Sequence, residues 1–63
     1  MWLMVMFDLP VVNKAERKSA NDFRNALLEW GFEMTQFSVY VRFCASDKQI
    51  ETYSRRIEAL LPS

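Results

Sequence analysis

The sequence predicts an α+β domain in which two helices cover a small β-sheet. Extended segments at residues 2–7 and 32–44 alternate with two segments, at 14–30 and after Ser46, in which apolar residues recur at helical spacing. Of the 63 residues, 51% are hydrophobic and only 1 is Gly, which favours a packed core over a disordered segment. A chain of this length forms one small domain.

Residues 2–7 form a short apolar run that ends at Asp8. The length of the run, its Val and its aromatic residues predict a strand buried on both faces, as in the centre of a sheet. Successive side chains of a strand point to opposite faces, so Met4 and Met6 are expected on one face, in phase with Asp8. The odd-numbered residues are expected on the other face.

The first helix is expected at residues 14–30. Asn13 is a good N-cap, and Glu16 three residues later completes the signal of a capping box. Gly31 is suited to end the helix in the left-handed conformation. The buried stripe is predicted from apolar residues at helical spacing, namely Ala20, Phe23, Leu27 and Trp30.

Residues 32–44 are rich in aromatic and β-branched residues and predict an extended segment. The apolar side chains change phase within it, from even positions at the start to odd positions from Phe37 onward. A shift of one residue turns every side chain to the opposite face, so a bulge or break is expected near 35–36. The segment is then one bent strand or two short ones, with Ser38 and Tyr40 assigned to its polar side.

A second helix is expected after Ser46, which serves as its cap with Gln49 at the capping-box position. Pro62 is expected just past the end of this helix. Its apolar stripe is predicted to contain Ile50, Tyr53, Ile57 and either Leu60 or Leu61.

The order of elements is strand, helix, bent strand or strand pair, helix. A long helix between strands favours a right-handed crossover and adjacent parallel strands, and a hairpin with a second helix on the same face gives an α+β sandwich. This is a ferredoxin-like βαββα(β) sandwich lacking its last strand, so residues 1–63 are predicted to be a single truncated ferredoxin-like domain. Without that strand the first strand is an exposed sheet edge. We expect that another chain covers this edge, that the chain is truncated, or that the protein is poorly soluble.

Charge and residue types narrow the classes of function. Eight basic residues balance eight acidic ones, so nucleic-acid binding requires a local patch or a dimer that joins two patches. The absence of His excludes Ser-His and Cys-His catalysis and leaves carboxylates as the candidate catalytic or metal-binding groups. A lone Cys44 without metal-ligand spacing predicts a reduced, cytoplasmic protein. The apolar N-terminus lacks a basic leader and stops at Asp8, so no membrane segment is expected.

Three stretches of the sequence together resemble the CRISPR-associated protein two family. They are the opening MWLMVMFDLP, the basic residues at the start of the first helix (Lys14, Arg17 and Lys18), and Gly31-Phe32 followed by QFSVY at 36–40. The resemblance runs the whole length of the chain and covers about the first two-thirds of a usual family member.

The resemblance implies a homodimer that bridges two dimers of the CRISPR integrase subunit and helps to hold prespacer DNA for insertion into the repeat array. Members are also described as metal-dependent endonucleases acting on RNA or DNA. In that case the Asp at the end of the first strand, here Asp8, meets its dimer mate and shares a divalent cation.

Asp8 therefore has a functional and a structural interpretation. It is the acidic residue at the end of an otherwise apolar strand, and Mg²⁺ is commonly held by one or two carboxylates together with water. One carboxylate per chain provides few ligands for a metal ion, whereas two carboxylates across the two-fold axis of a dimer suffice for one ion. The structural alternative is that Asp8 caps the turn before Pro10.

Five basic residues are candidates for contact with nucleic acid. Lys14, Arg17, Lys18 and Arg24 lie along the exposed part of the first helix, where a row of cations suits phosphate binding. The alternative is an ordinary solvated helix face, on which acidic residues dilute the positive charge. Arg42 is the one charge in an alternating strand, so it either reaches a phosphate or lines the solvent face.

The sequence is best interpreted as a scaffold subunit of CRISPR adaptation that acts as a dimer with prespacer DNA and the integrase subunit. One alternative is a true Mg²⁺-dependent endonuclease that uses Asp8 as its catalytic residue across the dimer. A second is a truncated interaction module that competes for dimer or integrase contacts. A related toxin-type ribonuclease is a more distant option.

Overall fold

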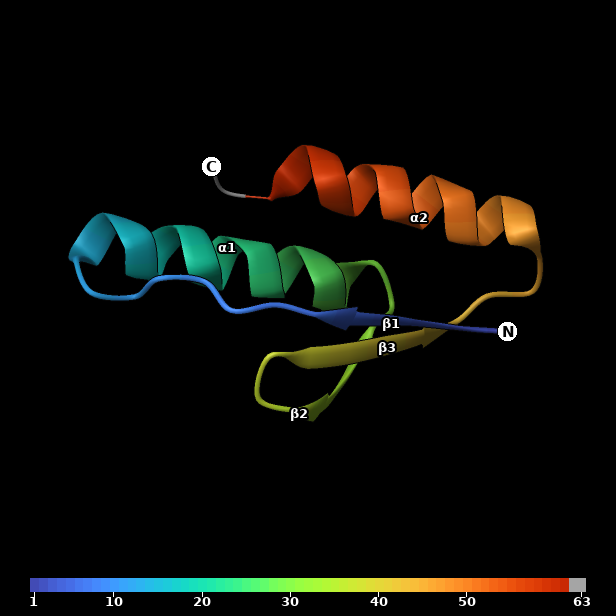
Figure 1. Ribbon diagram of the computed structural model, residues 1–63, viewed down its shortest axis with the longest axis horizontal. Coiled ribbons are helices and arrows are strands. Elements are labelled where there is room, and N and C mark those ends of the chain that lie inside the picture. Colours follow the sequence, from blue (N-terminus) through green and yellow to red (C-terminus); the bar gives the residue numbers. More distant parts are fainter. Residues whose placement is uncertain (62–63) are drawn as a thin grey trace.

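The computed structural model describes residues 1–61 and contains five elements, which confirm the α+β class. Both helices lie on the same side of the sheet (Figure 1). Pro62, expected just past the second helix, lies outside the described residues. In chain order the elements are β1 (Trp2–Met6), α1 (Lys14–Glu29), β2 (Glu33–Gln36), β3 (Val39–Phe43) and α2 (Asp47–Leu60).

The sheet has the strand order β1-β3-β2, and both pairs of neighbouring strands are antiparallel. The strands that flank α1, β1 and β2, are therefore parallel to each other as predicted, but β3 lies between them, so the prediction that they are adjacent is wrong. The hairpin after α1 folds β3 back into the place beside β1, where Trp2 faces Phe43 and Met6 faces Val39. β1 is left at an edge of the sheet, as expected for a ferredoxin-like fold without its last strand.

The expected break in the extended segment is confirmed. The pairing of β2 with β3 shifts register between Met34 and Gln36, and a turn at Phe37 and Ser38 separates the two strands. Ser38 has a φ of 69°, which is uncommon for a residue other than Gly. Phe37 therefore lies in a turn instead of on the apolar side of a strand.

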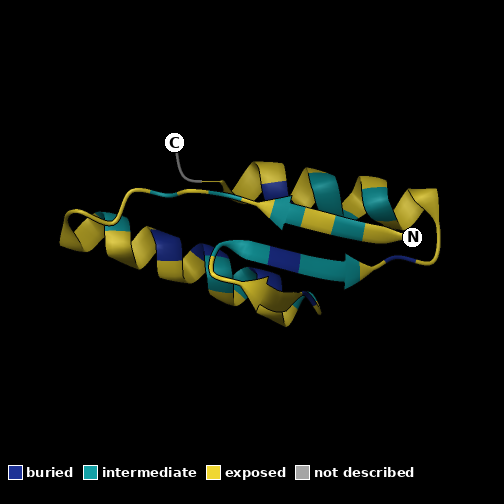
Figure 2. Cartoon of the chain, turned by 60° about the horizontal axis from the view of Figure 1, so that its bottom comes forward, coloured by how far each residue is buried: buried dark blue, intermediate teal, exposed yellow. Residues whose placement is uncertain are grey.

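The faces of β1 alternate as predicted, but only one of them is covered. Leu3 and Val5 are half-buried against the helices, whereas Met4 and Met6 are exposed on the opposite side (Figure 2). The prediction that this strand is buried on both faces is wrong, because the two helices occupy one side of the sheet and nothing among residues 1–61 packs on the other.

Tyr40 belongs to the core, so its assignment to the polar side of the strand is wrong. Only 2% of its surface is exposed, and its ring stacks on that of Phe7 with the centroids 5.6 Å apart. The reason is the register: Tyr40 pairs with Val5, whose side chain faces the helices. Ser38 is half-buried in the turn. The buried core cluster is formed by Phe23, Leu27, Phe32, Tyr40 and Ile57.

Capping signals in the sequence fix the N-terminal ends of both helices. The Asn13 side chain accepts a hydrogen bond from the backbone N–H of Glu16, and the Glu16 carboxylate accepts one from the N–H of Asn13. At the start of α2, Ser46 accepts a hydrogen bond from the N–H of Gln49. Among the described residues, no helix is long and apolar enough to cross a membrane.

The buried stripes follow the predictions with two differences. Trp30, beyond the last residue of α1, is half-buried, and Ile57 is the buried residue of α2. Leu60 and Leu61 remain exposed, and Leu61 borders an open hollow along β1.

Candidate nucleic-acid interface and metal ligand

Asp8 lies in the loop between β1 and α1. It is exposed and lines a hollow of about 400 Å³ between this loop and the first two turns of α1. Glu16 lines the same hollow, but its carboxylate is occupied by the N–H groups of Val12 and Asn13, both at 3.2 Å. Within residues 1–61 the Asp8 carboxylate forms neither an ion pair nor a hydrogen bond, including the turn-capping bond considered above.

The donor chemistry of Asp8 suits a hard cation such as Mg²⁺. This ion requires oxygen ligands that are not engaged elsewhere, together with retained waters and often a second carboxylate. The described residues contain no group of three or more His, Cys, Asp or Glu side chains placed to hold a metal ion. That a second Asp8 from a dimer mate shares the ion stays a prediction.

The structure brings together three of the five predicted basic residues. Lys14, Arg17 and Lys18 line a broad hollow of about 750 Å³ on the outer side of α1, together with Asn21 and Asp22. Asp22 partly neutralises this row, because its carboxylate lies 3.0 Å from the Lys18 ammonium group in an exposed pair.

Asp8 and this basic row lie on different sides of the N-terminal turns of α1. Each lines its own hollow, and Ala15 borders both. The Asp8 carboxylate therefore lies off the basic face.

Arg24 departs from the exposed row and is half-buried on the flank of α1. Its guanidinium carbon lies 4.7 Å from the ring centroid of Phe37 and 5.7 Å from that of Phe7. Its Nε is buried and has no hydrogen-bond partner among residues 1–61.

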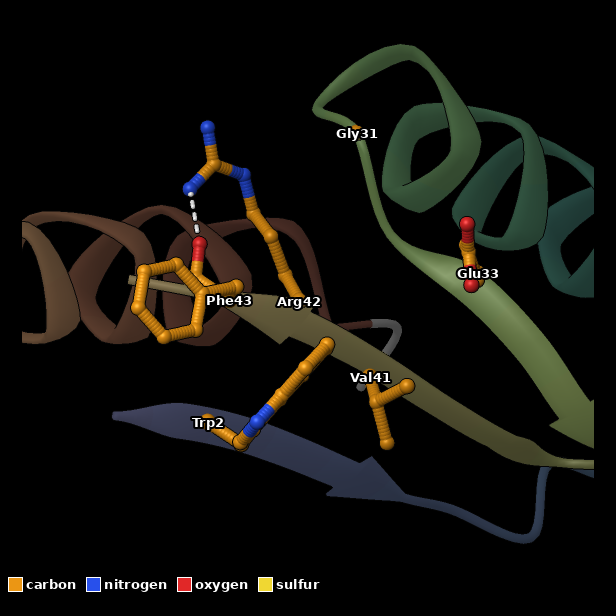
Figure 3. A pocket seen from close by; sticks show the side chains of 6 residues that line it. All are labelled: Trp2, Gly31, Glu33, Val41, Arg42 and Phe43. Carbon is orange, nitrogen blue, oxygen red and sulfur yellow. Dashed lines mark hydrogen bonds between the residues drawn. The ribbon is translucent and has the colours of Figure 1, made fainter. Parts of the chain in front are cut away.

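Arg42 faces the helices and not the open solvent side. Its Nε donates to the carbonyl oxygen of Trp30 at 2.7 Å, and its Nη1 donates to that of Phe43 at 2.9 Å (Figure 3). Its guanidinium carbon also lies 4.2 Å from the ring centroid of Tyr53. These contacts are structural, so the phosphate-binding role of Arg42 stays a prediction.

Sequence reasoning missed the most prominent surface of the molecule, the apolar side of the sheet that faces away from the helices. The continuous apolar run of residues 2–7 predicts burial of both faces and gives no sign that one of them is open. We call this surface the open sheet face; its apolar residues are Trp2, Met4 and Met6 of β1 and Val39, Val41 and Phe43 of β3.

The fold and its surfaces define a class: a small α+β domain with an apolar open sheet face and a separate basic helix face. Residues 1–63 match the family model described as CRISPR associated protein Cas2. The chain belongs to the Cas2 family.

Curated relatives support this assignment over the whole chain. A protein named CRISPR-associated endoribonuclease Cas2 from Paracidovorax avenae is 62% identical over 100% of this chain and 58% of its own length. Proteins of the same name from Ligilactobacillus salivarius and Flavobacterium psychrophilum are 51% and 50% identical, over 100% and 98% of this chain. The matches cover 62% and 54% of those two relatives, so the chain spans somewhat more than half the length of each.

Proposed function

We propose that this chain is a dimerising subunit of CRISPR adaptation that helps to hold prespacer DNA and contacts the integrase subunit. The observation that carries the proposal is the open sheet face. Trp2, Met4, Met6 and Phe43 are each more than half exposed on it. A contiguous apolar surface of this kind on a small protein marks an interaction site.

A second copy of the chain is the partner that suits the open sheet face. A two-fold interface brings the same patch together from both copies, so its centre must tolerate contact with itself. The centre of this face is uncharged, and among the strand residues its charged member is Glu33, on β2 at the edge remote from β1. Two copies can therefore meet across β1 and β3 without repulsion between like charges.

The free edge of β1 is a separate feature and suits an additional strand. A hollow of about 280 Å³ runs along β1 beneath α2, bordered by Val5 from the strand and by Ile57 and Leu61 from the helix side. An unpaired strand edge accepts another strand through main-chain hydrogen bonds. We assign this edge to the strand expected to complete the ferredoxin-like sheet in a longer protein.

DNA contact is assigned to the outer side of α1. The net charge of the chain is zero, so attraction to phosphate must come from the row of Lys14, Arg17 and Lys18 and be doubled by dimerisation. Neutralised phosphates release counterions, so binding is expected to weaken as salt rises.

Light scattering tests the dimer. We expect a mass of twice 7.5 kDa for the chain and a mass close to 7.5 kDa for Met4→Glu, which places a charge in the centre of the open sheet face. Val12→Glu is the matched control, because Val12 is 85% exposed in the loop before α1 and outside this face. A Met4→Glu variant that remains dimeric would assign the dimer contact to another surface.

The same measurement with the integrase subunit added separates the scaffold from the interaction module. Capture of the integrase subunit, together with salt-sensitive binding of duplex DNA, supports the scaffold. A stable dimer that binds neither the integrase subunit nor duplex DNA is the result expected of an interaction module.

A metal-dependent endoribonuclease is the second candidate, supported by the unengaged carboxylate of Asp8 and by the relatives' name, CRISPR-associated endoribonuclease. When bound, Mg²⁺ would supply positive charge at a phosphodiester and its attacking water. The contribution of this chain would be to hold the ion through Asp8, opposite the Asp8 of its dimer mate.

Asp8→Asn tests that candidate with labelled single-stranded RNA in the presence of Mg²⁺. We expect loss of RNA cleavage. The free energy of unfolding and the affinity for duplex DNA should not change, since Asp8 is exposed and lies off the basic row. Glu29→Gln, an exposed carboxylate at the end of α1, is the control. Cleavage that survives Asp8→Asn would eliminate the nuclease role of Asp8 and leave the scaffold proposal intact.

A further inference from the structure

Four planar side chains follow one another from the core to the surface at the β2–β3 turn. Tyr40, which is 2% exposed, stacks on Phe7 with the ring planes 20° apart. The guanidinium group of Arg24 contacts the ring of Phe7 and, at 4.7 Å, the ring of Phe37. Phe37 is the outermost member and is 77% exposed. We call this series the aromatic stack.

The backbone holds Phe37 in this outward position. Ser38, the next residue, adopts a φ of 69°, and its carbonyl oxygen accepts a hydrogen bond of 3.2 Å from the N–H of Phe7. A non-glycine residue in the left-handed region is mildly strained and persists only where its surroundings impose it. The turn is thus fixed to the residue that follows β1 while it presents a large apolar ring to solvent.

Arg24 places a positive charge directly behind this ring. Within residues 1–61 it has no ion-pair partner, and its buried Nε has no acceptor. Its Nη groups, unlike Nε, are not buried and form no hydrogen bond within residues 1–61, so they are available to an anion from outside the chain. An exposed aromatic ring next to an uncompensated guanidinium group combines the two elements used to bind single-stranded nucleic acid, a stacking surface and a cation for the backbone.

We propose that Phe37 stacks on an unpaired base of single-stranded nucleic acid, with Arg24 beside it for the adjoining phosphate. This inference rests on the proposed function, which already assigns nucleic-acid binding to α1, and adds a preference for unpaired bases. In a duplex the faces of the bases are covered by their neighbours, so a protruding ring gains a stacking partner only at single-stranded segments or frayed ends.

The test is fluorescence anisotropy with a short labelled oligonucleotide, single-stranded or annealed as a blunt duplex, at physiological salt. We expect Phe37→Ala to weaken single-strand binding about 5- to 150-fold, the range for loss of one stacked base, and to leave duplex binding unchanged. Phe37→Trp is expected to retain single-strand binding. Met34→Ala is the control, because Met34 is another exposed apolar residue, on β2, and lies outside the aromatic stack.

The outcomes separate this inference from the proposed function. Equal affinity of the chain and of Phe37→Ala for the single strand would overturn the stacking role while nucleic-acid binding stands. An equal loss for single strand and duplex would also overturn it, since the ring would then act through the fold or the backbone. A chain that binds neither form would overturn both proposals. Circular dichroism melting of each variant confirms that the comparison is made between folded proteins.

Discussion

At the scale of single residues, Arg42 connects three elements of the fold. From β3 it reaches the carbonyl oxygen of Trp30, just past α1, and the ring of Tyr53 on α2. The last turn of α1 contains no basic residue, so a cation from another element supplies the partner for its terminal carbonyl. The planar guanidinium group can make this hydrogen bond and lie over the ring at the same time.

Arg42→Lys should therefore destabilise the protein although it retains the charge. We expect the free energy of unfolding to fall by about 1–2 kcal/mol, because Lys lacks the planar guanidinium group. The fall is no larger because Arg42 is only half-buried. Urea unfolding followed by tryptophan fluorescence measures the change. Arg55→Lys is the control, because Arg55 forms an exposed ion pair with Glu51, one helical turn away. This substitution should lower the free energy of unfolding by less than about 0.5 kcal/mol. Equal stability of the two variants would contradict the structural role of Arg42.

At the scale of elements, the end of α1 is set by Gly31. Its φ is +86°, a conformation that disfavours residues with a Cβ, and a Cβ placed there would lie 3.3 Å from the Nε of Arg42. The N–H of Phe32 returns to the carbonyl oxygen of Leu27, which closes the helix. The turn that ends the helix and the arginine that bonds it are thus adjacent.

Gly31→Ala is expected to lower the free energy of unfolding by about 1–2 kcal/mol, through backbone strain and displacement of Arg42. Asn25→Ala, at an exposed position of α1, serves as the control and should change stability by less than about 0.5 kcal/mol. Combined with Arg42→Lys in a double-mutant cycle, Gly31→Ala should be less than additive, because both changes disturb the same hydrogen bond. Full additivity would show that the two residues act independently.

At the scale of the whole molecule, the small core and the open sheet face are linked. A domain of about 60 residues buries only about 60% of its unfolded surface and is marginally stable alone. Here the helices cover one side of the sheet, and the apolar residues of the other side remain in solvent. Burial of that side against a second copy would add the missing apolar contact.

Stability should then depend on protein concentration. We expect the thermal unfolding midpoint to rise as the chain is concentrated, because dissociation accompanies unfolding. The midpoint of Met4→Glu should be lower and independent of concentration, whereas that of Val12→Glu should follow the unmodified chain. Calorimetry over a series of concentrations measures this. A constant midpoint for the unmodified chain would speak against dimerisation through the open sheet face.

Much of the fold was predictable from the sequence because its signals are local. The Asn13 capping box, the stop at Gly31 and the start of α2 at Ser46 each depend on residues within one helical turn. The phase shift near 35–36 predicted the break between β2 and β3 for the same reason. Helical spacing likewise predicted that Lys14, Arg17 and Lys18 share one side of α1, but it did not predict that Arg24 departs from them.

Tertiary structure decided which side of each strand is the inside. Alternation in a strand predicts two faces but does not say which one the helices cover. Packing of both helices on one side buried Tyr40 and turned Arg42 inward, and it left Met4 and Met6 exposed. The place of β3 between β1 and β2 likewise depends on pairing between residues far apart in the chain. The sequence by itself determined the elements and their ends, whereas long-range packing and register determined the surfaces to which we assign function.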